Sequence, residues 1–154
     1  MLGKIKKVLG IEGVKVKLQL KDTYERSEES ITGKVIFTTK TDAKVRSYRL
    51  RLIETYVRGR GKAKQSDDYT LGELQESETF EVNANESVEI VFDMPYDFIQ
   101  SEMDKIQRGN FLTAGIISLA KKIKGVKSIY TLQVEADIVG TKLDPFDKAI
   151  VNFH

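Results

Sequence analysis

Apolar and polar residues alternate with a period of two along four stretches of the chain, at 14–20, 48–52, 88–94 and 130–138. Because successive side chains of a strand point to opposite faces, each stretch predicts a β-strand with one buried and one solvated face. Several such strands separated by turn residues are typical of an antiparallel β-sandwich or barrel that binds other molecules. The pattern therefore predicts a soluble all-β domain.

The same alternation predicts where the strands and the core lie. Turn signals divide the chain into strands at 14–20, 31–39, 45–57, 69–74 followed by 79–82, 88–94, 128–139 and 149–153. Gly33, inside the second of these strands, indicates a bulge or a close approach of another backbone. The residues expected to be buried between two packed sheets are Val16, Leu18, Val35, Leu50, Leu52, Ile90, Phe92, Leu132 and Val134.

Two segments depart from the strand pattern. Apolar residues at helical spacing run from Phe111 to Ile123, with Asn110 as a possible N-cap and Gly125 as a stop, which predicts one inserted amphipathic helix at about 110–124. A basic amphipathic segment at 2–9 predicts a second, short N-terminal helix. Each helix has two interpretations. It packs its apolar stripe on the sandwich, or it presents that stripe to a partner protein or an anionic membrane surface.

Composition excludes several kinds of chemistry. The chain of 154 residues has the length of one domain, and we expect a single domain over 1–154. Cysteine is absent and the one histidine is His154, which argues against disulfides, thiolate catalysis, metal sites and cofactors. A net charge of +2 predicts no nucleic-acid partner. No apolar run is long enough to span a membrane and the start lacks a signal peptide, so a cytoplasmic location is expected.

Charges are strongly segregated along the sequence. From Lys44 to Lys64 there are eight basic residues and one acidic residue, whereas from Gln65 to Asp104 there are twelve acidic residues and none that is basic. One interpretation is cross-strand pairing between a basic strand and its acidic neighbour. The other is a sandwich with a positive and a negative side that steers partners. The two interpretations are compatible.

Two short motifs could carry chemistry. Asp144 and Asp147 flank Pro145, which suits a cation site or a pair of catalytic carboxylates, and equally suits a hairpin turn with a preset φ. A hard cation takes about six or more oxygens and no third acidic residue is adjacent, so we expect a turn and no metal. The basic tip with Arg58, Arg60 and Lys62 could grip a phosphate. Since no aromatic residue is interleaved, a solvated hairpin loop is expected.

Motifs at both ends of the chain resemble one known family. They are the amphipathic start at 2–11 with the following Val14-Lys15-Val16, the segment Ser30-Ile31-Thr32-Gly33-Lys34-Val35, the long strand containing Leu50-Arg51-Leu52 and Thr55-Tyr56-Val57, and the turn Leu143-Asp144-Pro145-Phe146-Asp147. In this order and spacing they resemble the bacterial sporulation-control proteins with arrestin-like folds. The resemblance implies an immunoglobulin-like sandwich similar to the arrestin N-terminal domain, in adaptors and regulators that have no active site. That family usually continues into a second sandwich, and its loop at 99–125 is shorter.

We therefore interpret the chain as a non-enzymatic regulatory adaptor or scaffold that binds other proteins. A peripheral membrane module that uses its basic amphipathic helices is the alternative, and an enzyme would require a pocket with convergent carboxylates. The residues expected to contact a partner or a membrane are Leu2, Ile5, Lys6, Lys7, Arg58, Arg60, Lys62, Phe111, Ile116, Lys121 and Lys122.

Overall fold

The computed structural model describes residues 13–59, 65–98 and 127–154. Within these ranges it contains one short 3-10 helix, η1 (Arg26–Glu28), and eight strands. The strands are β1 (Lys15–Leu20), β2 (Ser30–Thr38), β3 (Ala43–Arg58), β4 (Gln65–Glu76), β5 (Phe80–Val82), β6 (Ser87–Pro95), β7 (Lys127–Ile138) and β8 (Phe146–Val151). The predicted all-β architecture is confirmed for this part of the chain.

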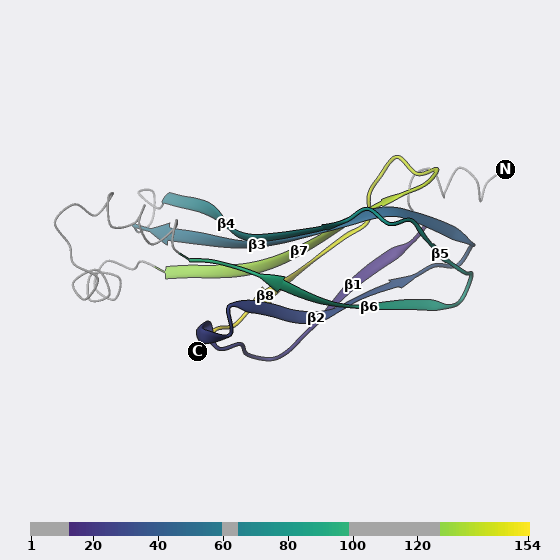
Figure 1. The fold of residues 1–154 in the computed structure, drawn as a ribbon. Coiled ribbons are helices and arrows are strands. Elements are labelled where there is room, and N and C mark those ends of the chain that lie inside the picture. Colours follow the sequence, from purple (N-terminus) through teal and green to yellow (C-terminus); the bar gives the residue numbers. More distant parts are fainter. Residues whose placement is uncertain (1–12, 60–64, 99–126) are drawn as a thin grey trace.

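The strands form two antiparallel sheets that lie in separate layers (Figure 1). One sheet has the order β1-β2-β6, and the other has the order β4-β3-β7-β8, with β5 paired to the start of β3. The long strand β3 is therefore central, with β4 and β5 on one side and β7 on the other. The edge strands β1 and β8 of the two sheets lie against each other, so the sandwich is joined along that side.

The core lies between the inward faces of the two sheets. Strand β3 shows the underlying pattern, because Tyr48, Leu50 and Leu52 are buried while the residues between them are partly exposed. All residues predicted for the core are buried except one; the buried ones are Val16, Leu18, Val35, Leu50, Leu52, Phe92, Leu132 and Val134. Period-two alternation predicted these faces correctly, because burial of one face fixes the register of every strand.

Ile90 is the exception, since its side chain is only partly buried. It lies on β6, which pairs with β2 on one side and ends its sheet on the other. Its side chain points inward as the alternation predicted, but no strand of the described residues continues the sheet beyond it. The prediction of full burial was therefore wrong, because the sequence pattern gives the face of a residue and not its distance from the sheet edge.

Gly33 occupies a point of close backbone approach, one of the two alternatives predicted for it. A Cβ atom at this position would lie 2.8 Å from the carbonyl oxygen of Gln19 on β1 and 2.9 Å from the ring of Phe92 on β6. Both distances are shorter than carbon atoms tolerate, so a side chain here would push apart the neighbouring strands. Glycine at this site lets all three strands of the smaller sheet come together.

Several predicted boundaries differ from the structure. Strand β4 is longer than the predicted 69–74, and β8 begins at Phe146 instead of 149. The connection between the strands predicted at 14–20 and 31–39 contains η1 and the buried Tyr24, whose hydroxyl donates to the carbonyl of Thr32 at 2.6 Å. The two predicted helices lie outside the described residues, so they remain predictions.

Candidate functional site

A groove opens where β1 begins, next to the turn between β7 and β8. It has a volume of about 510 Å³ and is lined by Gly13–Val16 on one side and by Thr141 and Leu143–Phe146 on the other. Most of its lining residues are apolar, and its charged members are Lys15 and Asp144. Such a composition is suited to holding a segment of another molecule by shape and apolar contact.

Asp147 links the edge strands of the two sheets and is not part of a turn. It lies on β8, opposite Val134 of β7. Its Oδ2 accepts a hydrogen bond of 2.9 Å from the main-chain N–H of Leu18 on β1. A hydrogen bond from an N–H to a carboxylate is stronger than one from an N–H to a neutral acceptor. The prediction that Asp147 forms the hairpin turn was therefore wrong, since the residue joins the edge strands of the two sheets.

Asp144 does lie in the connection between β7 and β8, as predicted. Desolvation raises the pKa of its carboxyl group, and the negative charges of Asp137 and Glu135 and a hydrogen bond with Glu135 raise that pKa further. Arg46 balances one of these neighbours, because its guanidinium lies 3.1 Å from the carboxylate of Asp137. The three carboxyl groups and Arg46 therefore form a compact charged network beside the groove.

Large apolar side chains are exposed next to the groove. Leu143 is 62% exposed, and Phe146 and Ile150 on the outer face of β8 are 66% and 67% exposed. Lys148 lies between the last two on the same face, and its Nζ lies 6.0 Å from the centroid of the Phe146 ring. We name Leu143, Phe146, Lys148 and Ile150 the β8 patch. Exposed apolar residues that are gathered in one place mark interaction sites more often than scattered ones do.

The chain is similar in sequence and in fold to known proteins. A family model described as SpoOM protein matches residues 2–99. The chain belongs to the SpoOM protein family. The crystal structure of Spo0M, a sporulation control protein from Bacillus subtilis, resembles the chain with a TM-score of 0.61 and 19% sequence identity. The match covers 92% of this chain and 49% of that one, so the chain spans about half the length of that Spo0M protein.

At this identity the likeness to the Bacillus protein concerns the fold alone. Comparison with curated proteins gives no match. The family match confirms the resemblance drawn from the sequence motifs. In this SpoOM-family chain, no helix of the described residues is long and apolar enough to cross a membrane.

Most residues expected to contact a partner lie outside the described residues. These are Leu2, Ile5, Lys6, Lys7, Arg60, Lys62, Phe111, Ile116, Lys121 and Lys122. Arg58 is described, and its guanidinium donates to Oε1 of Gln65 at 3.3 and 3.2 Å and lies 3.3 Å from Asp67. The structure therefore engages Arg58 with the facing strand β4, and the remaining contact residues stay predictions.

Cross-strand pairing between the basic strand and its acidic neighbour is confirmed. Arg49 of β3 lies 3.7 Å from Glu73 of β4 and 3.8 Å from Glu135 of β7. Arg58 and Asp67 form a second pair between β3 and β4. Pairs as exposed as Arg49 and its partners contribute little to stability, about 0–1 kcal/mol each. These pairs balance part of the basic charge of β3 with acidic side chains of β4 and β7.

A buried glutamate side chain on β3 was not predicted from the sequence. Glu54 is fully buried, and its Oε2 accepts a hydrogen bond of 2.5 Å from the hydroxyl of Ser128 on β7. Its position in the sequence indicates this burial, because Glu54 lies two residues after Leu52 and four after Leu50 and so shares the inward face of these core residues.

An aromatic cluster at the same end of the sandwich was also missed. Tyr96, Phe98, Tyr130 and Phe153 have ring centroids 4.9–5.7 Å apart. The guanidinium carbon of Arg26 lies 4.4 Å from the centroid of Phe98, and its Nη2 donates to the hydroxyl of Tyr130 at 3.0 Å. These residues come from η1, the segment after β6, β7 and the end of the chain, and no sequence motif links them.

We predict that Asp144 and Asp147 bind no divalent cation. Among the residues that the structure describes, no group of three or more His, Cys, Asp or Glu side chains is placed to hold a metal ion. Millimolar Ca²⁺ or Mg²⁺ should therefore leave the thermal unfolding temperature unchanged. A saturable rise with either ion would contradict this prediction, because a ligand that binds only the folded state stabilises it.

Proposed function

We propose that this SpoOM-family chain is an arrestin-like, immunoglobulin-like regulatory domain that acts as a non-enzymatic adaptor and binds other proteins. The β8 patch carries the proposal, because Leu143, Phe146 and Ile150 expose large apolar side chains beside a groove of matching character. The hydrogen bond from Leu18 to Asp147 supports the proposal, since it holds β1 and β8, the strands beside the groove, against each other. Membership of a family whose solved relative is a sporulation control protein supports a regulatory role.

The expected partner surface is apolar with an acidic margin. Phe146 and Ile150 would enter the partner's apolar contact, and Lys148 between them would face an acidic side chain. Exposed aromatic residues are the commonest anchors of protein interfaces, and truncation of one anchor typically costs about 2 kcal/mol or more of binding free energy. A single substitution in the patch should therefore reduce capture of the partner by about tenfold or more.

Affinity capture from native lysate with quantitative mass spectrometry tests the proposed function. Phe146→Asp should reduce recovery of the specific partners by about tenfold or more, since it places a charge in the apolar contact. Phe146→Leu is the matched control and should retain them. Both variants should unfold at the parent temperature, because the side chain is exposed. An identical set of captured proteins for Phe146→Asp and the parent would overturn the proposal.

The alternative is binding at an anionic membrane surface, which the lysines near the β8 patch favour. Lys142 and Lys148 accompany Leu143, Phe146 and Ile150, a combination of basic and apolar groups that suits lipid head groups. The amphipathic segments at 2–9 and 110–124, on which this interpretation first rested, lie outside the described residues. Sedimentation with anionic vesicles separates the two functions. Sedimentation that is lost in Phe146→Asp would support the membrane function in place of the adaptor.

A further inference from the structure

Strand β6 forms an open edge on the side of the sandwich opposite the groove. It pairs with β2, and no other described strand forms a ladder with it. The other sheet meets it closely near Gly72, where the N–H of Asp97 donates to the carbonyl of Leu71 at 2.9 Å. Before that point Val88 and Ile90 are only partly buried although they are on the inward face, and Val91 on the outer face is 72% exposed.

The register shows which main-chain groups of β6 face this open side. The N–H of Leu18 donates away from β2, to Asp147, so the pair Leu18–Val35 exchanges no main-chain hydrogen bonds. The N–H and C=O of Val35 therefore point away from β1 and toward β6, so Val35 and its partner Ile90 form a main-chain hydrogen-bonded pair. The neighbours Glu89 and Val91 therefore direct their N–H and C=O groups outward.

Among the described residues, this edge has few of the features that usually protect an edge strand. Protected edges are short, bulged, covered by a helix or loop, or carry proline, lysine or an inward-pointing charge, and the proline of β6, Pro95, is only its last residue. Strand β6 has nine residues, its register with β2 shows no shift, and Val88 and Ile90 on its inward face are apolar. A long, regular edge of this kind is a template for an additional strand.

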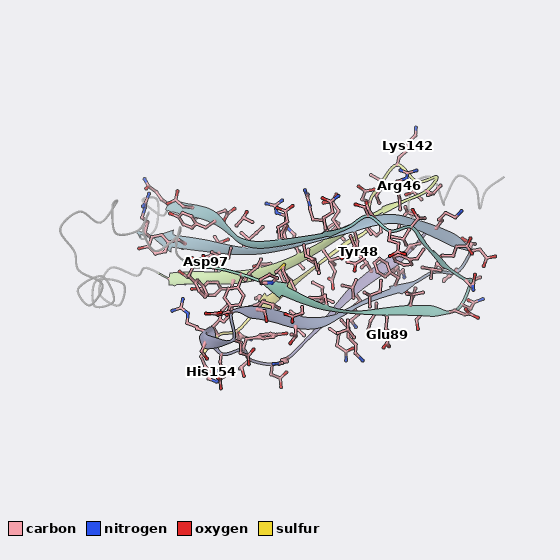
Figure 2. The ribbon with its side chains drawn as sticks, in the orientation of Figure 1. Arg46, Tyr48, Glu89, Asp97, Lys142 and His154 are labelled. Atoms are coloured by element: carbon pink, nitrogen blue, oxygen red, sulfur yellow. The ribbon has the colours of Figure 1, made fainter. Side chains whose placement is uncertain are left out.

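Charge specifies the strand that would fit. From Gln65 to Phe98 the sequence has ten acidic residues and no Lys or Arg. On the outer face of β6, Glu89 and Asp93 flank Val91. Glu89 lies 3.5 Å from Lys34 of β2, but its side chain is still 52% exposed and projects away from the sandwich (Figure 2). An added strand would place its own side chains opposite these residues, where lysine or arginine would be favoured and acidic residues repelled. Its alternate side chains would cover Val88 and Ile90, and so should be apolar.

We propose that the free edge of β6, Ser87–Asp93, binds an extended segment of a partner protein in which basic and apolar residues alternate. The segment adds to the three-stranded sheet as a fourth strand. This shares with the proposed function only the premise that the chain binds proteins, because the site lies on the other side of the sandwich from the β8 patch. A second copy is not the occupant. Two β6 edges would oppose acidic residues, and the basic strand β1 already lies against β8 of its own chain.

The test uses the full chain and a labelled peptide of alternating lysine and valine, with binding measured by fluorescence anisotropy. Glu89→Lys should weaken binding by about tenfold or more, because it replaces attraction with repulsion. Glu135→Lys is the matched control. Glu135 is 53% exposed and forms an ion pair with Arg49, and Glu89 is 52% exposed and forms an ion pair with Lys34. Glu135 lies on β7 of the other sheet. The control should bind the peptide as the parent does.

Strand addition is separated from charge attraction by a second peptide. N-methylation of alternate residues keeps the charges and removes the N–H donors that would pair with β6, so this peptide should bind at least about tenfold more weakly. Equal binding of the two peptides, an equal loss in Glu135→Lys, or no binding to the parent would each overturn the proposal. Self-association of the parent that Glu89→Lys abolishes, measured by sedimentation, would assign the edge to a second copy and would overturn it too. None of these results depends on Phe146, so the proposed function is tested independently.

Discussion

Leu50→Ala should destabilise the domain by about 2–5 kcal/mol. Leu50 is fully buried on the central strand β3, opposite Leu74 of β4 and Val134 of β7. Its removal leaves a cavity that the two flanking strands, held in register by their ladders, cannot collapse to fill. Urea unfolding followed by circular dichroism would measure the loss, seen as a lower midpoint with an unchanged slope.

Leu143→Ala provides the control for this measurement, because the side chain is 62% exposed and its truncation should change stability by less than about half a kcal/mol. If Leu50→Ala also cost less than about half a kcal/mol, the inward face of β3 would be assigned incorrectly, since a shift of one residue moves every side chain of a strand to the other face.

Gly72→Ala should destabilise the domain by about 1–3 kcal/mol, although it adds a single methyl group. The new Cβ would lie 2.5 Å from the carbonyl oxygen of Pro95 and 3.1 Å from Cβ of Tyr96. The closest of these atoms is backbone, so it cannot rotate away, and β4 must move apart from the end of β6. That movement would also lengthen the hydrogen bond from Asp97 to Leu71, now 2.9 Å.

Two measurements check this second prediction. Urea unfolding gives the loss of stability, and hydrogen exchange should show a faster amide at Asp97 than in the parent. Thr70→Ala, at an exposed position of the same strand, is the control and should leave Asp97 exchange unchanged. Parent-like stability and exchange in Gly72→Ala would show that the two sheets are not in contact at this point.

The two sides of the sandwich differ in a way that suits an adaptor. On one side β1 and β8 are joined through Asp147, and the β8 patch is apolar with lysine. On the other side β6 has an open edge flanked by acidic residues. If both proposals hold, the domain can contact two partners of different chemistry at once, because neither site overlaps the other.

The sequence by itself determined the strands and the faces of the core. Alternation along β1, β3, β6 and β7 is a local property of the chain, and a strand with a period-two pattern has one way to bury its apolar side. Leu50, Leu52 and Val134 were placed correctly for this reason. The sequence also predicted that Gly33 marks either a bulge or a close backbone approach, and the structure shows the close approach.

Only the tertiary structure decided how these strands meet. The role of Asp147 depends on Leu18 of β1, its hydrogen-bond partner, which is 129 residues away in the chain. Its sequence neighbours Asp144 and Pro145 indicated a turn instead. The partial exposure of Ile90 depends on which strand ends the sheet, and strand order is set by the packing of the whole domain. The aromatic cluster around Phe98 and the hydrogen bond from Ser128 to Glu54 likewise join segments distant in sequence. The pattern of one strand shows which of its faces is buried, but not which strand lies next to it. The candidate sites therefore depend on how the two sheets pack together.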